Sequence, residues 1–119
     1  NASLNPDNVG RETPSVEIDV WTIDDYVARN PIARLDAIKL LAQGVEFDVL
    51  QGAKATIAKY RPKIFFLYEP AYWARKNLSL ADAQRFFAGF GYDVHIVEFG
   101  PRRAVNGEVG LGQVLLAVP

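Results

Sequence analysis

The sequence predicts one α/β domain built on a mostly parallel sheet, and three observations lead to this fold class. Two short apolar runs, at 37–42 and 64–68, are almost free of polar residues, which is typical of strands buried on both faces of a parallel sheet. Between them, apolar residues recur every four positions from 45 to 57, the spacing of one helical face. Gly44 and Pro62 interrupt the pattern at the two junctions. A strand, a glycine turn, a helix and a second strand predict a βαβ unit.

Composition limits the function classes. We expect a loop or arm at 1–15. Because 50% of the 119 residues are hydrophobic, we expect residues 16–119 to form a single packed domain. A net charge of -1 provides no electrostatic footprint for nucleic acid or for an anionic membrane. With no cysteine and one histidine, the chain has no disulfide, no thiol catalysis and no recognisable metal site. No apolar run approaches the roughly 20 residues of a membrane span, and without a secretory signal we expect a cytoplasmic protein.

Two elements precede the βαβ unit. Residues 16–21 alternate between apolar and polar side chains, which predicts a strand with one wet face. Thr22 can then cap a short helix that runs to about Arg29, because Asp25 occupies the third helical position as in a variant capping box.

The predicted crossover helix is a single helix from Val45 to Tyr60, because Pro62 cannot continue it. Residues 71–77 have no clean period and predict a loop or one irregular turn. Ser79 should cap the next helix together with Asp82. Its expected buried face consists of Ala83, Phe86, Phe87 and Phe90, and Gly91 stands where a left-handed C-cap is expected.

Two strands close the chain. The first is predicted at 92–99, with Val94, Ile96 and Val97 facing inward, and the second at 113–118. Because only a loop separates them, we expect an antiparallel hairpin at the end of the sheet.

A set of spaced residues runs through the predicted βαβ unit. Its members are Lys39, Gly44, Glu46, Val49-Leu50 and Gly52-Ala53, with Arg61-Pro62 and Glu69 downstream and the run Thr22 to Tyr26 upstream. This pattern resembles that of FkbM-type S-adenosylmethionine-dependent methyltransferases, whose motifs have the forms I-K-[I]-D-V-E-G-x-E-x-x-V-L-x-G-A and T-L-D-D-L. The resemblance is close from Val16 to Glu69 and looser in the remainder.

The resemblance implies a partial Rossmann-like sheet with helices on its faces. In that family the strand order is 3-2-1-4-5-7-6, with the seventh strand antiparallel, and this chain would supply the second half. The complete parent would transfer a methyl group from S-adenosylmethionine to a hydroxyl on a sugar or natural-product scaffold.

Two departures from the family bear on activity. The family holds its cofactor through a glycine-rich turn from strand to helix, whereas 89–91 closes a helix here and 110–112 precedes a strand. We therefore expect the chain alone to bind no cofactor. In addition, Leu41 and Gln43 replace the family's Asp and Glu, and leucine offers no lone pair to a metal or proton. Leu41 is expected to be packed core.

Five polar or aromatic residues are candidates for a site. The catalytic candidates are Glu69, Glu46 and Lys39, and the substrate-binding candidates are Glu69, Tyr72 and Trp73. Each has a structural alternative. Glu69 could be a plain helix cap, and Glu46 could be favoured by the helix dipole. The Lys39 stem could be buried with its ammonium in water, and the aromatic residues could be core.

Two functions remain open. The chain is either the C-terminal part of an FkbM-like O-methyltransferase, or a non-catalytic domain of that ancestry that serves assembly or binding. The strand at 37–42 would keep one free edge, which either 16–21 or a second molecule can cover. We expect a homodimer, formed by edge pairing or by exchange of the N-terminal arm.

Overall fold

A computed structural model describes residues 14–97 and 113–119. Its elements are α1 (Ile23–Arg29), β1 (Ala37–Leu40), α2 (Glu46–Gln51), α3 (Lys54–Tyr60), β2 (Lys63–Tyr68), α4 (Pro70–Arg75), α5 (Leu80–Ala88), β3 (Asp93–Ile96) and β4 (Gln113–Val118). Most of the predicted arm at 1–15, and the segment between the last two strands from 98 to 112, lie outside the described residues. No helix in the described part is long and apolar enough to cross a membrane.

The four strands form one sheet in the order β1-β2-β4-β3. β1 and β2 are parallel, with Leu40 level with Phe66, which confirms the βαβ unit. β4 runs antiparallel to both β2 and β3 and lies between them, which confirms the antiparallel hairpin. The same order, with the last strand inserted antiparallel, is the one that the resemblance implied for the last four strands.

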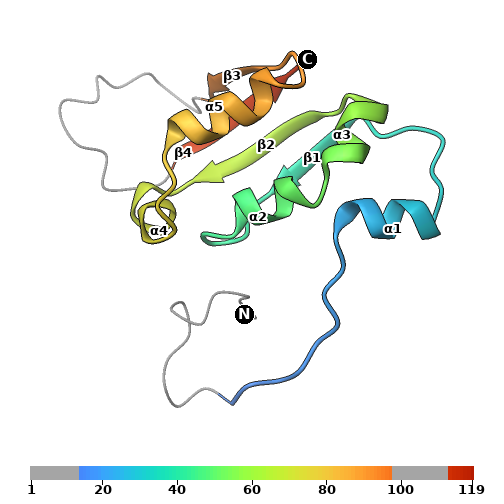
Figure 1. The fold of residues 1–119 in the computed structure, drawn as a ribbon, viewed down its shortest axis with the longest axis horizontal. Helices are drawn as coiled ribbons and strands as arrows, with labels where there is room; N and C mark the ends of the chain where they lie inside the picture. Colours follow the sequence, from blue (N-terminus) through green and yellow to red (C-terminus); the bar gives the residue numbers. More distant parts are fainter. Residues whose placement is uncertain (1–13, 98–112) are drawn as a thin grey trace.

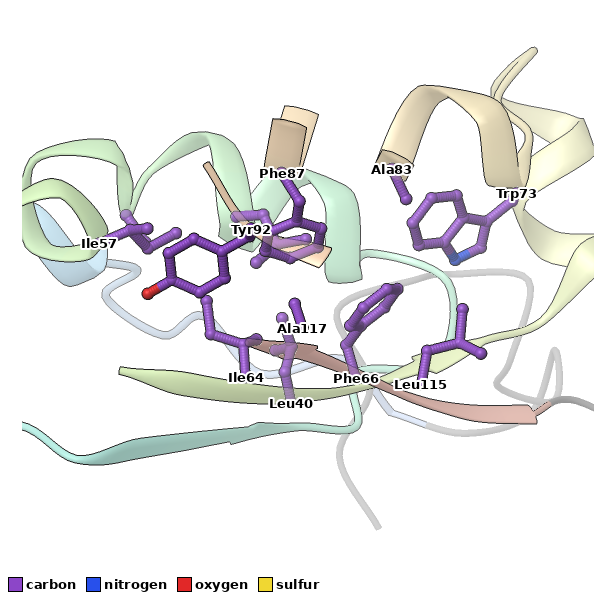
Figure 2. Close-up of a cluster of buried hydrophobic side chains, with 12 residues drawn as sticks. Leu40, Ile57, Ile64, Phe66, Trp73, Ala83, Phe87, Tyr92, Leu115 and Ala117 are labelled. Carbon is purple, nitrogen blue, oxygen red and sulfur yellow. The ribbon is translucent and has the colours of Figure 1, made fainter. Parts of the chain in front are cut away.

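Helices α2 to α5 lie on one face of the sheet, and the core fills the space between (Figures 1 and 2). The largest fully buried side chains are Trp73, Phe66, Phe87, Leu50, Ile57, Ile64 and Leu115. The prediction that the first strand is buried on both faces is wrong. Leu40 points toward the helices, whereas Ala37 and Lys39 are exposed, because none of the described helices covers the other face.

The crossover is two helices and not one, so the prediction of a continuous helix from Val45 to Tyr60 is wrong. The backbone turns at Gly52 and Ala53, and α3 begins anew at Lys54. Glycine is a poor helix former, and a carboxylate from α1 caps the first amides of α3, as described below. Arg61 ends α3 in the left-handed conformation, directly before Pro62 as expected.

The N-terminal cap of α1 is confirmed: the Thr22 hydroxyl accepts a hydrogen bond from the Asp25 amide at 3.0 Å. The strand predicted at 16–21 is wrong, since residues 14–22 have no regular secondary structure and the apolar side chains at 16, 18 and 20 are exposed. Alternation makes a segment able to form a strand, but a strand also requires a neighbour to complete its hydrogen bonds. No described strand lies beside this segment.

The second half of the chain differs at two points. Residues Pro70–Arg75 form a short helix where a loop or one irregular turn was predicted at 71–77, because Pro70 occupies the first turn with its φ already helical and Trp73 is buried. Ile96 is exposed and does not face inward as predicted, because it ends a strand at the edge of the sheet. The capping box of Ser79 and Asp82 at the start of α5 is confirmed, and Gly91 has the positive φ expected of a left-handed cap.

Candidate functional site

The carboxyl ends of β1 and β2 are the part of this fold where a site is expected. The two strands are parallel and in register at Leu40 and Phe66, so their carboxyl ends meet at one edge of the sheet. Open α/β sheets bind ligands at that edge. The turn after β1 and the residue Glu69 after β2 therefore lie on neighbouring strands, as the motif spacing predicted.

The turn after β1 is held by Glu46. Its Oε1 accepts a hydrogen bond from the Ala42 amide and its Oε2 one from the Gly44 amide, both at 2.9 Å. The side chain is fully buried, in the first turn of α2. Gln43 and Gly44 both have positive φ, a pair of backbone conformations that the carboxylate clamp stabilises. Glu46 thus fixes the shape of the turn, and both of its oxygens are engaged with backbone amides.

Glu69 differs from Glu46 in its surroundings. It is half-buried at the N-cap of α4, and its side chain makes no capping hydrogen bond. Within the part of the chain that the structure describes, its carboxylate has no ion-pair or hydrogen-bond partner. Of the two acidic candidates, Glu69 is the one whose lone pairs stay available to a ligand at the carboxyl edge.

The aromatic candidates separate into a surface residue and a core residue. Trp73 is 1% exposed and packs edge-on against Tyr68 and Phe47, with ring centroids 5.1 and 5.6 Å apart. Its Nε1 is buried without a hydrogen-bond partner among the described residues and points toward the sheet, above Leu115 (Figure 2). Trp73 is therefore core in this structure. Tyr72 is half-buried, with the Arg75 guanidinium 5.1 Å from its ring centroid.

Leu41 is not packed core, and that prediction is wrong. It follows Leu40, the last residue of β1, directly and is 50% exposed. Lys39, two residues earlier, is exposed as well. The position at which the family carries Asp is thus open to solvent here, and it presents an apolar side chain.

Asp24 has a structural role that the sequence did not reveal. Its carboxylate accepts hydrogen bonds from the Ala55 and Thr56 amides and from the Thr56 hydroxyl, at 3.0, 2.8 and 2.7 Å. Its own amide donates to the Gly52 carbonyl at 2.9 Å. Burial opposes ionisation of Asp24, but the hydrogen bonds from Thr56 and Ala55 outweigh it and lower the pKa of the carboxyl.

The hydrogen bonds of Asp24, here called the Asp24 clamp, connect the sequence motif at 22–25 with the one at 52–53 and with the start of α3. A side chain at Gly52 would meet the Thr22 side chain at 3.0 Å, so the glycine allows the start of α1 to approach the break between α2 and α3. The signal was present in the sequence as T-I-D-D upstream and G-A downstream. Nothing in their local patterns, however, indicated that they touch.

Two hollows flank α1. One, of about 270 Å³, is mostly apolar; its walls are Val20, Trp21, Thr22, Ile23, Val45, Asp48, Val49 and Gly52. The other, of about 250 Å³, lies between α1 and α3. Neither includes Glu69 or Lys39 among its lining residues. Among the described residues, no group of three acidic or histidine side chains is arranged to hold a metal ion.

The comparisons with known proteins agree with this fold. The sequence model of a family described as the methyltransferase FkbM domain matches residues 2–99. No curated protein and no solved structure matches the chain.

Proposed function

Because the chain belongs to the methyltransferase FkbM domain family, we propose that it forms the acceptor-side part of an S-adenosylmethionine-dependent O-methyltransferase. The acceptor is a hydroxyl on a sugar or natural-product scaffold, as the resemblance implies. The observation that carries the proposal is the family match over residues 2–99. The parallel strands that bring Glu69 and the Glu46 turn to one edge support it.

Each candidate residue has a role in this proposal. Glu69 accepts a hydrogen bond from the acceptor hydroxyl and orients its oxygen, since its carboxylate is unengaged among the described residues. Glu46 is a positioning residue that holds the turn after β1. In this proposal the exposed Lys39 and the half-buried Tyr72 contact the acceptor scaffold, whereas the buried Trp73 supports the edge from the core.

We propose further that this chain does not bind S-adenosylmethionine by itself. The cofactor requires free backbone donors at a glycine-rich turn between strand and helix. The turn after β1 does not fit this requirement, because the Ala42 and Gly44 amides already donate to Glu46. Calorimetric titration should therefore detect no saturation. Micromolar binding, about −8 kcal/mol, would contradict this part of the proposal.

A second function is favoured by one observation. Leu41 exposes an apolar side chain at the position where the family carries an acid, and Gln43 replaces a second acid. A domain that had lost acid–base chemistry while keeping its fold would show this pattern. The alternative is a non-catalytic domain that serves assembly or binding.

A chimera separates the two functions. Residues 14–119 would replace the corresponding part of an active FkbM-type methyltransferase with a known acceptor, and transfer of a labelled methyl group would be measured. The acceptor-side role predicts transfer, and Glu69→Gln should lower the rate about 10²–10⁴-fold if Glu69 takes the proton. Glu17→Gln is the control. A chimera that binds cofactor but transfers nothing, even with Leu41→Asp and Gln43→Glu, would favour the non-catalytic domain.

A further inference from the structure

Three residues other than glycine have a positive φ in the described part of the chain. They are Gln43 at 53°, Arg61 at 53° and Asn77 at 58°. This backbone conformation is strained for any residue that carries a Cβ atom, whereas glycine adopts it without that cost. A side chain at such a position therefore needs a reason, either in the residue type or in what the side chain binds.

Two of the three residues have such a reason. Asparagine is one of the few types that adopt this conformation readily. The Arg61 guanidinium donates a hydrogen bond to the Phe90 carbonyl and lies 4.8 Å from the centroid of the Tyr92 ring. Glutamine is not among the tolerant types, and the Gln43 side chain is exposed at the surface. What its amide can reach from the turn after β1 is therefore of interest.

The turn brings Gln43 to the same edge of the sheet as Glu69. Leu40 is level with Phe66 in the parallel pair, and Gln43 and Glu69 each follow three positions later. Neighbouring strands lie about 4.8 Å apart, so the two residues follow adjacent strand ends. The Glu46 carboxylate holds the backbone amides on either side of Gln43, at 2.9 Å each. The strained backbone at this position is therefore fixed from a buried side chain, and the glutamine is presented on a rigid turn.

We propose that Gln43 is an acceptor-binding residue whose side-chain amide hydrogen-bonds a second oxygen of the acceptor, next to the hydroxyl that Glu69 orients. This inference rests on the proposed function. A carboxylate only accepts hydrogen bonds, whereas a primary amide offers two donor hydrogens and one acceptor oxygen. The pair is complementary to two neighbouring oxygens, of which one donates its proton to Glu69 and the other accepts from Gln43. The acceptor class is therefore a vicinal diol and not an isolated alcohol.

Thermal melting of the purified chain is the first test. In Gln43→Gly the relief of backbone strain offsets the greater freedom of glycine in the unfolded state, so the variant should melt at the wild-type temperature or above it. Arg61→Gly is the matched control, because it starts from the same φ of 53° and also loses its contacts with Phe90 and Tyr92. It should melt at a lower temperature. If Gln43→Gly melts as low as Arg61→Gly, the Gln43 side chain holds the fold and the proposal is overturned.

The specificity of the chimera described above is the second test. Its parent enzyme is chosen to have a vicinal-diol acceptor, and the competing substrate is the deoxy analogue that lacks the neighbouring oxygen. The chimera should favour the diol by about tenfold or more in kcat/KM. Gln43→Gly should treat the two acceptors alike, and Gln43→Asn, which keeps an amide, should retain part of the preference. A preference that Gln43→Gly leaves unchanged would overturn the proposal, since a purely structural residue would alter both acceptors equally.

A binding measurement separates this inference from the proposed function. If no chimera transfers a methyl group, the proposed function is wrong, but binding of the diol can still be measured on the chain itself. NMR with ¹⁵N-labelled protein follows the side-chain amide of Gln43, which is assigned by its absence in Gln43→Gly. A saturable shift on addition of the diol, and none with the deoxy analogue, supports the contact. No shift with either compound overturns it.

Discussion

The carboxylate of Asp24 lies 2.8 Å from the Thr56 backbone nitrogen, although 32 positions separate the two residues in the sequence. This contact fixes α1 against the start of α3. It also explains why the crossover consists of two helices. The amides at the start of α3 receive their hydrogen-bond acceptor from α1, so they need not continue the ladder of α2.

Removing this carboxylate should destabilise the domain. Asp24→Ala leaves the Ala55 and Thr56 amides and the Thr56 hydroxyl without an acceptor, and a lost helix cap typically costs about 1–2 kcal/mol. Urea unfolding measures the difference. Asp25→Ala is the control, because the neighbouring side chain makes no hydrogen bond to the described residues. Equal losses of unfolding free energy in the two variants would show that the hydrogen bonds of Asp24 do not stabilise the domain.

The stabilisation that the Asp24 carboxylate contributes should depend on pH. Folding lowers the pKa of Asp24 from its ordinary value of 3.8. Its stabilisation is therefore complete above that value and is lost as the pH falls through the lower pKa of the folded state. The difference in unfolding free energy between wild type and Asp24→Asn should thus narrow as the pH falls below 3.8. Asp36 and Asp82 also have lowered pKa values, but both proteins retain them and their effects cancel. A gap that stays constant over this range would contradict the role of ionised Asp24.

Glu46→Gln should be costly although it keeps the shape of the side chain. An amide has one acceptor oxygen, so either the Ala42 or the Gly44 amide would face another donor in a buried position. Such an unsatisfied group costs about 1–3 kcal/mol. Glu17→Gln, in the exposed N-terminal segment, is expected to change stability by less than about 0.5 kcal/mol. If thermal melting finds the two variants alike, the clamp on the turn is not structural.

Leu41→Asp should be tolerated. Leu41 is half-exposed directly after β1, so the new carboxylate stays in water, and the expected change in unfolding free energy is below about 1 kcal/mol. Leu40→Asp, one residue earlier, buries its carboxylate against the core and should prevent folding. Circular dichroism compares the two. If the Leu41→Asp protein fails to fold, Leu41 is packed in the core after all.

Tyr92→Phe should test a buried hydrogen bond at the far end of the core. The Tyr92 hydroxyl donates to the Pro62 carbonyl at 2.6 Å. Burial raises the pKa of Tyr92, against the opposing charge of Arg61, so the hydroxyl keeps its proton. Losing this bond should cost about 1 kcal/mol. Tyr60→Phe removes a similar bond to the Ile32 carbonyl at an exposed site and should cost less. The opposite ranking in urea unfolding would contradict the importance of burial here.

Local patterns predicted those parts of the fold that depend on neighbouring residues. The caps at Thr22 and Ser79 and the stop before Pro62 each follow from chemistry within a few positions. The parallel pairing of β1 with β2 followed from the helical period between the two apolar runs, because parallel strands need a crossover long enough to hold a helix.

The predictions that were wrong concern features that depend on residues far away in the sequence. The break at Gly52 is stabilised by Asp24, which the helical period does not reveal. The segment 16–20 alternates as a strand does, yet the described part of the chain offers it no partner. The prediction that Leu41 is core assumed that both faces of the sheet are covered, whereas the described helices cover one face. Candidate site residues were found through motif positions, but the engagement of Glu46 with the turn required coordinates.

The position of β4 between β2 and β3 has a consequence for synthesis of the chain. Translation produces β3 before β4, yet in the described sheet β3 pairs with β4 alone. During synthesis on the ribosome, the edges of β2 and β3 that pair with β4 therefore lack hydrogen-bond partners until residues 113–118 have emerged. Only then can the three strands pair. A nascent chain stalled before position 113 should be readily cut by protease and should be a good chaperone client, whereas emergence of residues 113–118 should end both at once.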